Sequence, residues 1–394
     1  MRRCLAALAV ALLCATAPAA QAGPGDLDRS FSKDGKLGFN PYKLGGTVRG
    51  LALLDRRNPL LSVQAQRGAD VAPTWISLSA AGRVSSRALL PPPAFYAPLI
   101  ADGYALTEYR YDPAATRYGL SRIGAREAIT LTLEPQVSVY AFGVDAQGRA
   151  VLVGNSGRHG RVWRFLPDGT PDPSFSGDGH VDVDGGRLVL RPDGRIYLCG
   201  GVYLTALDAS GNRLAGFRHG RVLPPRRHRS EYGLVSHMIS APGGGLFVIG
   251  GGYYEERAWI ARLRPDGRLD TTWGDRGYVV RKAALSRASF STAAVDRRGR
   301  LLLAGNHLSG DYGFNALIVR LTRGGKIDRR FASDGRKVFR LAKVAGVVIE
   351  ASDIQHVAVD DRDRIVLAGN VYDNEYVDRE DYGSPYPAIA RLKG

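Results

Sequence analysis

The stretch RLRPDGRLDTTWGDRG, residues 262–277, combines a tight-turn signal, an aromatic residue and a closing glycine at fixed spacing. Trp273 follows Gly267 by six residues, and Gly277 follows four residues later. The same spacing recurs at Gly169, Phe175 and Gly179, at Gly325, Phe331 and Gly335, and at Gly25, Phe31 and Gly35. Gly211 and Phe217 keep the first half only. Self-similarity of this kind is typical of repeat architectures.

A second phrase pairs two apolar runs around a turn and ends in glycine. Five clear copies are AFGVDAQGRAVLVGN (141–155), LVLRPDGRIYLCGG (188–201), MISAPGGGLFVIGGG (238–252), AAVDRRGRLLLAGN (293–306) and VAVDDRDRIVLAGN (357–370). Two weaker copies precede them, LALLDRRNPLLSVQAQ (51–66) and LIADGYALTEYR (99–110). The sequence therefore contains seven copies.

The spacing of the copies predicts the fold. The turn positions Asn58, Gly103, Gly148, Gly194, Gly244, Gly299 and Asp363 are separated by 45, 45, 46, 50, 55 and 64 residues. Four-stranded propeller blades repeat at such intervals, and evenly punctuated short strands indicate an all-β fold. We predict a β-propeller of seven four-stranded blades, each with an inner strand, a second, a third, and an outer strand that carries the aromatic residue.

The repeat also predicts how the ring closes. The chain ends in PAIARLKG, where Arg391 and Leu392 are in phase with Arg262 and Leu263 of a third strand. It resumes the phrase at Gly25, directly after the turn. We expect the N-terminal segment to supply the outer strand of the last blade by pairing with residues 387–393, because a closed ring leaves few open sheet edges.

These phrases resemble the delta-60 repeat of bacterial exported proteins, roughly PDGxLDxSFGxxG followed by a QPDGKIxVAG strand pair. Residues 141–394 and 25–35 fit this pattern, whereas residues 70–135 lack the aromatic residue. The resemblance implies an exported, propeller-like protein of unsettled molecular role, and it supplies no catalytic residues.

The N-terminus predicts export. Arg2 and Arg3 precede a short apolar run, and Ala20-Gln21-Ala22 is a small-residue cleavage site, so we interpret residues 1–22 as a signal peptide. Residues 23–394 then form a single domain in the periplasm or outside the cell. No later stretch is long and apolar enough to predict a membrane span.

Of three cysteines only Cys199 remains after cleavage, so no internal disulfide is expected, and Cys199 is interpreted as a buried, inert thiol.

The charge suggests anionic partners without identifying one. The net charge of +16 becomes about +14 without the two leader arginines. Because 46 arginines and 8 lysines are spread over the whole chain, we favour compositional drift over a dedicated charged surface. We expect a monomer that binds an unidentified protein or an anionic polysaccharide, and we do not expect a nucleic acid partner.

No catalytic or metal motif is present. The chain lacks H-E-x-x-H, G-x-S-x-G, a P-loop and zinc-spaced cysteines, so we predict no catalytic residue and no metal ligand. The aspartates Asp145, Asp193, Asp266 and Asp296 fit hairpin turns. No cofactor is expected; the alternative is a structural calcium ion near 176–180, 182–186 or the acidic run 373–381.

The variable loops are the predicted binding face. Short turns lie at one face of the disc, and the other face receives loops that differ among blades, where binding sites usually lie. The candidate residues are Tyr253, Tyr254, Glu255, His307, Tyr312, Tyr372 and Arg227.

The predicted function is a binding or scaffold module. The alternatives are a propeller-type hydrolase, lyase or lactonase with a site at the channel mouth, and self-association between the basic segment 224–230 and the acidic segment 373–381.

Overall fold

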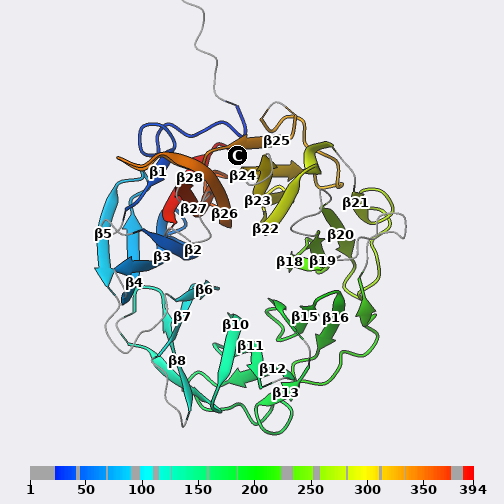
Figure 1. Ribbon diagram of the computed structural model, residues 1–394. Helices are drawn as coiled ribbons and strands as arrows, with labels where there is room; N and C mark the ends of the chain where they lie inside the picture. The colour runs from blue at the N-terminus through cyan, green and yellow to red at the C-terminus, as the bar shows by residue number, and fades with distance from the viewer. Residues whose placement is uncertain are drawn as a thin grey trace, which may run out of the picture.

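The fold is a ring of seven antiparallel sheets around one axis, seen in a computed structural model (Figure 1). The structure describes residues 23–40, 45–67, 70–89, 98–109, 115–125, 127–157, 159–183, 185–222, 234–251, 258–280, 283–309, 313–332, 334–373 and 385–394. Each sheet has four strands, ordered from the axis to the rim. The prediction of a seven-bladed β-propeller is confirmed, including two complete blades in residues 46–133.

We number the blades from the first complete one in the chain. Blade 1 contains β2 (Gly46–Leu54), β3 (Asn58–Arg67), β4 (Asp70–Leu78) and β5 (Val84–Leu89). Blade 2 contains β6 (Leu99–Ala101), β7 (Tyr104–Glu108), β8 (Thr116–Arg122) and β9 (Ile129–Leu133). Blade 3 contains β10 (Val137–Val144), β11 (Ala150–Ser156), β12 (His159–Phe165) and β13 (His180–Asp182). Blade 4 contains β14 (Arg187–Leu190), β15 (Ile196–Gly200), β16 (Tyr203–Leu207) and β17 (Gly220–Arg221).

The remaining blades complete the ring. Blade 5 contains β18 (Val235–Ser240), β19 (Leu246–Gly250), β20 (Trp259–Leu263) and β21 (Tyr278–Val280). Blade 6 contains β22 (Ala288–Val295), β23 (Leu301–Ser309), β24 (Gly313–Leu321) and β25 (Arg336–Phe339), after a short 3-10 turn η3 (Ala283–Leu285). Blade 7 contains β26 (Ile349–Val359), β27 (Ile365–Asp373), β28 (Tyr386–Leu392) and, as its outer strand, β1 (Lys36–Gly38).

The ring closes as predicted. Strand β1 runs antiparallel to β28, with Lys36 opposite Ala390 and Gly38 opposite Ala388. A further bridge joins Leu27 to Leu392, next to the C-terminus. In Figure 1 the blue N-terminal strand accordingly lies beside the red and orange C-terminal strands. The closing blade thus gains the outer strand that its own third strand would otherwise lack.

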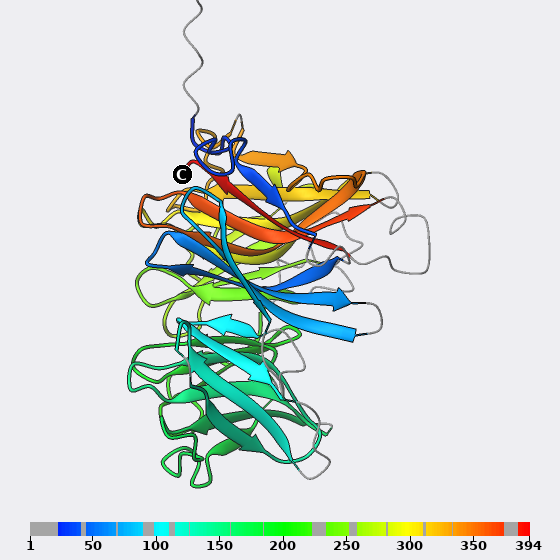
Figure 2. The same cartoon turned by 90° about the vertical axis from the view of Figure 1, so that its left-hand side faces the viewer.

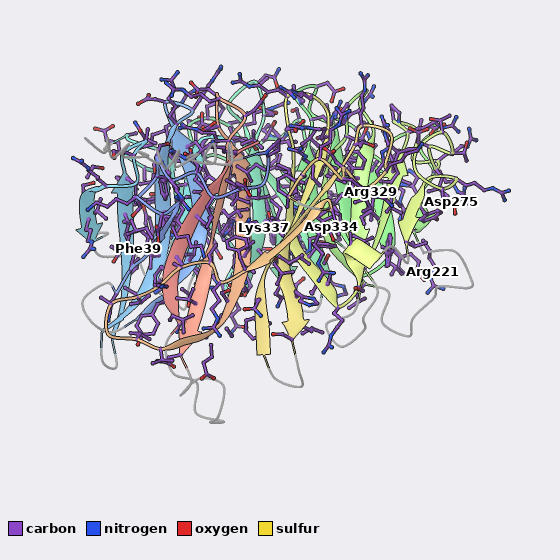
Figure 3. All side chains as sticks on the ribbon, turned by 90° about the horizontal axis from the view of Figure 1, so that it is seen from above. Phe39, Arg221, Asp275, Arg329, Asp334 and Lys337 are labelled. Carbon is purple, nitrogen blue, oxygen red and sulfur yellow. The ribbon has the colours of Figure 1, made fainter. Side chains whose placement is uncertain are left out.

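Short turns occupy one face of the disc. Gly148, in the first turn of blade 3, faces Pro167 of its last turn, and the same two turns approach each other at Gly244 and Pro265 in blade 5. The strands run from this face to the other, as the edge-on view shows (Figure 3). Asp145 behaves as a hairpin aspartate, since its Oδ1 accepts hydrogen bonds from the main-chain N–H groups of Gln147 and Arg149.

Two sequence expectations about local structure are wrong. The aromatic residues do not lie within the outer strands: Phe175, for example, lies in a turn that ends before β13 begins at His180. Segments 155–160 and 306–315, which the repeat predicts as variable loops between the second and third strands, are mostly strand: β11 reaches Ser156 before β12 starts at His159, and β23 reaches Ser309 before β24 starts at Gly313. Strong β-propensity in both flanks extends these hairpins.

The hydrophobic core lies between blades. Six buried apolar clusters each join two neighbouring blades, from 2 and 3 onward around the ring to 7 and 1. In the described part of the chain, no such cluster joins blades 1 and 2. Cys199 is among the buried residues, and burial raises its thiol pKa to about 12, as suits an inert core cysteine.

A buried arginine stabilises three of the blades. Arg164, Arg320 and Arg391 are each 1% exposed and occupy the same place in a third strand. Their guanidinium groups lie over Phe175, Phe331 and Phe31, at 4.6, 4.6 and 4.9 Å from the ring centroids. Each also pairs with an aspartate of the following turn, Asp172, Asp328 and Asp28, at 2.7 or 2.8 Å. Part of the arginine excess is therefore a structural feature of the repeat.

Candidate binding site at the propeller axis

The innermost strands share an irregularity that positions the site. In β2, β10, β18, β22 and β26 the pairing register shifts at the same place, which leaves one residue unpaired there; β26 has a second shift at Glu350. The unpaired residues are Arg49, Tyr140, Ser236, Ser291 and Gln355. A bulge of this kind bends the strand and redirects side chains, and bulges are frequent next to functional sites.

Two histidines directly follow bulged residues. His237 follows Ser236 in blade 5, and His356 follows Gln355 in blade 7. Their imidazoles interact electrostatically with each other although blade 6 lies between their blades. Side chains from blades that are not neighbours can interact in this way only near the axis, where the innermost strands converge.

Two arginines extend this group to further blades. Arg187 of β14 acts electrostatically on His237, and Arg49 of β2 acts on His356. Both arginines are solvent-exposed, whereas both histidines are half-buried. We call Arg49, Arg187, His237 and His356 the axial cluster. It draws on blades 1, 4, 5 and 7.

Burial keeps the two histidines uncharged at neutral pH. Desolvation is the main reason that the pKa of His237 falls to about 4, and the charges of Arg187 and His356 lower it further. Desolvation lowers the pKa of His356 to about 4 as well, with a smaller contribution from Arg49. Each imidazole therefore offers one donor and one acceptor nitrogen beside permanent guanidinium charges.

One carboxylate adjoins the cluster. Glu108 of blade 2 interacts with Arg49, and its Oε2 accepts a hydrogen bond from the Tyr118 hydroxyl at 3.4 Å. Burial raises the pKa of Glu108, against the lowering effects of Tyr118 and Arg49. The axial cluster itself holds two guanidinium groups and two imidazoles, and Glu108 acts on it through Arg49.

A buried polar network supports the cluster from behind. Asp353 of β26 accepts hydrogen bonds from the main-chain N–H of Asn370 at 3.0 Å and from the Tyr372 hydroxyl at 3.1 Å. Gln355, the bulged residue, also donates to it, and Asn370 Oδ1 accepts from Val48 N of blade 1 at 3.0 Å. The network fixes Gln355, which immediately precedes His356. Burial raises the pKa of Asp353 in spite of these donors.

Two of the seven sequence-predicted site residues, His307 and Tyr372, lie within the described part of the chain, and neither belongs to the axial cluster. Tyr253, Tyr254, Glu255, Tyr312 and Arg227 lie outside the described residues, as does most of the acidic segment 373–381. Of the two described residues, Tyr372 is 7% exposed and belongs to the Asp353 network, with its ring 5.2 Å from that of Phe314.

His307 is half-buried in strand β23. Its Nδ1 lies 2.8 Å from Arg336 Nη2 and 3.0 Å from the Arg287 carbonyl oxygen. Desolvation lowers its pKa, and the two arginine charges lower it further. His307 and Tyr372 therefore hold structural contacts at the ends of strands, and the structure does not bring them into the axial cluster.

Sequence reasoning missed the axial cluster, although a signal was present. Arg187, His237 and His356 each stand seven residues before the turn position of their repeat, at Gly194, Gly244 and Asp363. A charged or titratable residue seven positions before the turn interrupts an otherwise apolar inner strand. Comparing this position across the copies would have grouped the three residues.

The axial cluster has the chemistry of an anion site. Guanidinium groups bind carboxylates and phosphates through paired hydrogen bonds, and neutral imidazoles add further donors. Within the described residues, no three histidines, cysteines or carboxylates come together as a metal site would require.

These features define the chain as a seven-bladed β-propeller with two arginines and two histidines on its innermost strands. Residues 148–175 match the family described as a domain of unknown function (DUF5122) beta-propeller. No curated protein matches the sequence significantly. No described helix is long and apolar enough to cross a bilayer.

Two solved structures share the fold over most of their length. YCF48 bound to D1 peptide is 14% identical, with 94% of this chain and 98% of that chain covered and a TM-score of 0.52. A catalytically inactive virginiamycin B lyase from Staphylococcus aureus with quinupristin is 10% identical, with 90% and 98% covered and a TM-score of 0.51. At these identities the similarity shows the fold alone.

Proposed function

We propose that this protein is an exported binding module that holds an anionic ligand at the propeller axis. The ligand is an acidic segment of a protein or an anionic polysaccharide, and the axial cluster binds it through Arg49 and Arg187. Export rests on the signal peptide predicted in residues 1–22 and on the resemblance to the delta-60 repeat. We expect the mature chain to act as a monomer.

One observation carries the proposal: four cationic or protonatable side chains from blades 1, 4, 5 and 7 gather where the innermost strands converge. Ligand sites are common at the mouths of β-barrels, where strands converge in a similar way. The peptide in the YCF48 structure and the quinupristin in the lyase structure are examples of ligands on this architecture.

The test is calorimetric titration of the mature chain, residues 23–394, with oligogalacturonate and with poly-glutamate as anionic probes. We expect salt-dependent binding of at least one probe, and at least tenfold weaker binding by the double variant Arg49→Gln/Arg187→Gln. Arg264→Gln/Arg268→Gln is the matched control, because it removes two exposed charges from a turn of blade 5. Equal loss in both variants would show general charge attraction and would contradict the proposal.

A lyase or hydrolase acting on an anionic substrate is the second candidate. The observation that favours it is the pair of uncharged imidazoles beside two guanidinium groups, since an uncharged histidine can accept a proton and a guanidinium can stabilise a developing anion. His237→Ala/His356→Ala would then abolish turnover of the polysaccharide probe while binding persists. Binding without turnover by the unmodified chain would leave the binding module as the function.

A further inference from the structure

The third strands of the blades can be compared position by position, because one main-chain hydrogen bond recurs in them. Leu214 N donates to Ala206 O in blade 4 as Asp270 N donates to Arg262 O in blade 5. An isolated bridge aligns the following turn in the same way. Blade 4 is polar at three positions that face the preceding blade and are apolar in blade 5. These positions are Tyr203, Thr205 and Arg213 in blade 4, and Trp259, Ala261 and Leu269 in blade 5.

The first of these positions is covered in blades 5 and 6 but open in blade 4. Trp259 is 3% exposed and its counterpart Leu317 in blade 6 is 0% exposed, whereas Tyr203 is 55% exposed. Val222, in the connection that leads to blade 5, belongs to the apolar cluster that contains Trp259. The connection from blade 3 to blade 4 is only residues 183–186, VDGG, and two of its four residues are glycines. This short connection leaves Tyr203 uncovered.

A cavity of about 620 Å³ lies between blades 3 and 4 at this place. Its lining includes Ser176, Val181, Tyr203, Thr205 and Arg213. Figure 2 shows the teal and green strands of these blades running from one face of the ring to the other. The cavity follows them from Tyr203, at the start of β16, to Arg213 in the turn after its end. We call it the rim cavity, and its volume falls within the roughly 300–1,000 Å³ of small-molecule sites.

The rim cavity holds a cation without a counter-charge. The Arg213 guanidinium makes no hydrogen bond, ion pair or ring contact with a residue that the structure describes. Arg161, which holds the Tyr203 position in blade 3, pairs with Glu134 at 2.8 Å and with Asp182 at 2.5 Å. Asp182 is the one acidic residue among the described lining of the rim cavity, and Arg161 already engages its carboxylate.

A hydroxyl group and an aromatic ring extend the polar surface away from this guanidinium. Thr205 is 9% exposed, and its hydroxyl makes no hydrogen bond with a described residue. The Tyr203 ring is held by the Arg221 guanidinium, 5.6 Å from its centroid. Leu207, which bridges to Arg213, lies four residues after Tyr203 in the strand, so the ring and Arg213 are about 13 Å apart. A ligand that meets all three side chains is elongated, with an anionic group at one end.

The third strand leaves no edge to which a peptide strand could be added. β16 pairs with β15 on one side and with β17 on the other. Beyond the end of β17, Ala206 N donates to His219 Nδ1 at 3.4 Å, and Ala206 O accepts from Leu214 N. Recognition in the rim cavity therefore depends on side chains, which suits a sugar, because its hydroxyls pair with polar side chains and its CH groups pack on an aromatic ring.

We propose that the rim cavity binds a short acidic sugar chain, with a uronic acid carboxylate on Arg213 and a sugar ring against Tyr203. The guanidinium binds the carboxylate through paired hydrogen bonds. The Thr205 hydroxyl bonds a ring hydroxyl between them, and the apolar face of the pyranose packs on the tyrosine ring. The rim cavity is separate from the axial cluster, and it binds its ligand whether or not an anion binds at the axis.

Calorimetric titration with digalacturonate tests the proposal. The titrated protein is the mature chain with Arg49→Gln/Arg187→Gln, so that the axial cluster does not contribute and the two proposals can fail separately. We expect one binding site per chain, and at least tenfold weaker binding of the methyl ester of digalacturonate, in which the carboxylates are blocked. Absence of binding, or equal binding of the acid and the ester, would overturn the proposal.

Variants that borrow residues from other blades locate the binding. Arg213→Leu introduces the residue of blade 5, and Thr205→Val introduces the residue that blade 6 has at Val319, so both variants should fold. We expect at least tenfold weaker binding by Arg213→Leu and about fivefold weaker binding by Thr205→Val. Arg268→Leu is the matched control, because it removes one exposed charge from the corresponding turn of blade 5, and it should bind normally. Equal weakening by Arg213→Leu and Arg268→Leu would contradict the rim cavity.

Tetra-glutamate distinguishes a sugar from an acidic peptide in the same titration. It should not bind the protein with Arg49→Gln/Arg187→Gln, because the rim cavity offers a peptide no main-chain partners on β16. Binding of tetra-glutamate that Arg213→Leu abolishes, without binding of digalacturonate, would place an acidic peptide in the rim cavity and overturn the proposal of a sugar.

Discussion

At the scale of single residues, two buried charged groups of the described structure each meet several hydrogen-bond partners. Asp353 has four donors around its carboxylate, and the buried Arg164 guanidinium donates to Asp172, Ser174 and Ala209. In blade 4 both members of this pair are replaced: Ala206 stands in the place of the arginine and Leu214 in the place of the aspartate. The main-chain hydrogen bond shows the equivalence, because Leu214 N donates to Ala206 O as Asp172 N donates to Arg164 O in blade 3. Because both residues are replaced together, neither an arginine nor an aspartate is buried without its partner at this position. An unpaired buried charge would cost several kcal/mol.

The Asp353 network gives the first prediction. Asp353→Asn places an amide N–H₂ against the Tyr372 hydroxyl and the Gln355 amide, which donate to that oxygen. We expect a loss of about 1–3 kcal/mol in the free energy of unfolding, measured by urea denaturation. Tyr372→Phe removes one donor only and should cost about 0.5–1.5 kcal/mol. An Asp353→Asn variant as stable as the parent would refute the proposed role of the carboxylate.

Blade 6 gives the second prediction. Asp328→Leu removes the partner of Arg320, whose Nη1 already has no hydrogen-bond partner, and should destabilise the protein by about 3–5 kcal/mol. Arg320→Ala/Asp328→Leu reproduces the arrangement of blade 4 and should recover part of that loss. The comparison is made by chemical denaturation of the three proteins. A double variant less stable than Asp328→Leu alone would contradict this account of the pair.

At the scale of the elements, the third-to-outer turn decides how blades join. Where the turn carries an aromatic residue, the next blade must present glycine, because the ring leaves no room for a Cβ. The turn also carries the aspartate that meets the buried arginine. Hydrogen bonds from Ser174 and the charge of Arg164 hold the pKa of Asp172 below its usual value, although burial alone would raise it. One turn thus supports both its own blade and its neighbour.

A pair of glycine substitutions tests this dependence. Gly325 and Gly124 both have positive φ, +79° and +91°, so alanine is strained at either by about 1 kcal/mol. Only at Gly325 would the new Cβ also approach a ring, 2.6 Å from Trp273. We expect Gly325→Ala to lower the thermal midpoint clearly more than Gly124→Ala. Equal shifts in the two variants would show that the ring does not fill the turn position.

At the scale of the whole molecule, closure depends on the N-terminal segment. Residues 23–38 supply strand β1, the Phe31 ring and the Asp28 partner of Arg391. Their removal leaves the edge of β28 open and a buried arginine without its carboxylate. Open edges of this kind favour association between chains.

A truncation gives the corresponding prediction. The chain from residue 39 onward should lose cooperative thermal unfolding and aggregate in size-exclusion chromatography, whereas removal of residues 1–22 alone should not affect either property. A peptide of residues 23–40 added in trans should restore the unfolding transition in part. A stable, monomeric truncated protein would contradict closure by β1.

The repeat predicts the architecture from the sequence. The axial cluster depends on contacts between inner strands that are far apart in the sequence, and the repeat does not specify these contacts. Gly267, Trp273 and Gly277 predict the turn and the blade because local turn chemistry requires those residue types. His237 and His356 lie 119 residues apart in sequence, and only the radius of the ring and the bulges at Ser236 and Gln355 bring them together. Loop variability directed attention to the loops themselves, whereas the axial cluster lies in the inner strands that begin at the same face.

The central claim is that an anion binds at the axial cluster, and the histidines report on it directly. Protonation of His237 and His356 is disfavoured in the free protein, with pKa values of about 4. A bound anion stabilises the protonated form and raises both pKa values, so the complex takes up protons and binding strengthens as the pH falls from 7 to 5.

The decisive measurement is an NMR titration of histidine-labelled mature protein, with and without saturating oligogalacturonate. His237→Gln and His356→Gln variants assign the two resonances. The account predicts pKa values well below 6.5 in the free protein and an increase of both on binding. Bound ligand with both histidine pKa values unchanged would place the anion elsewhere and contradict the central claim.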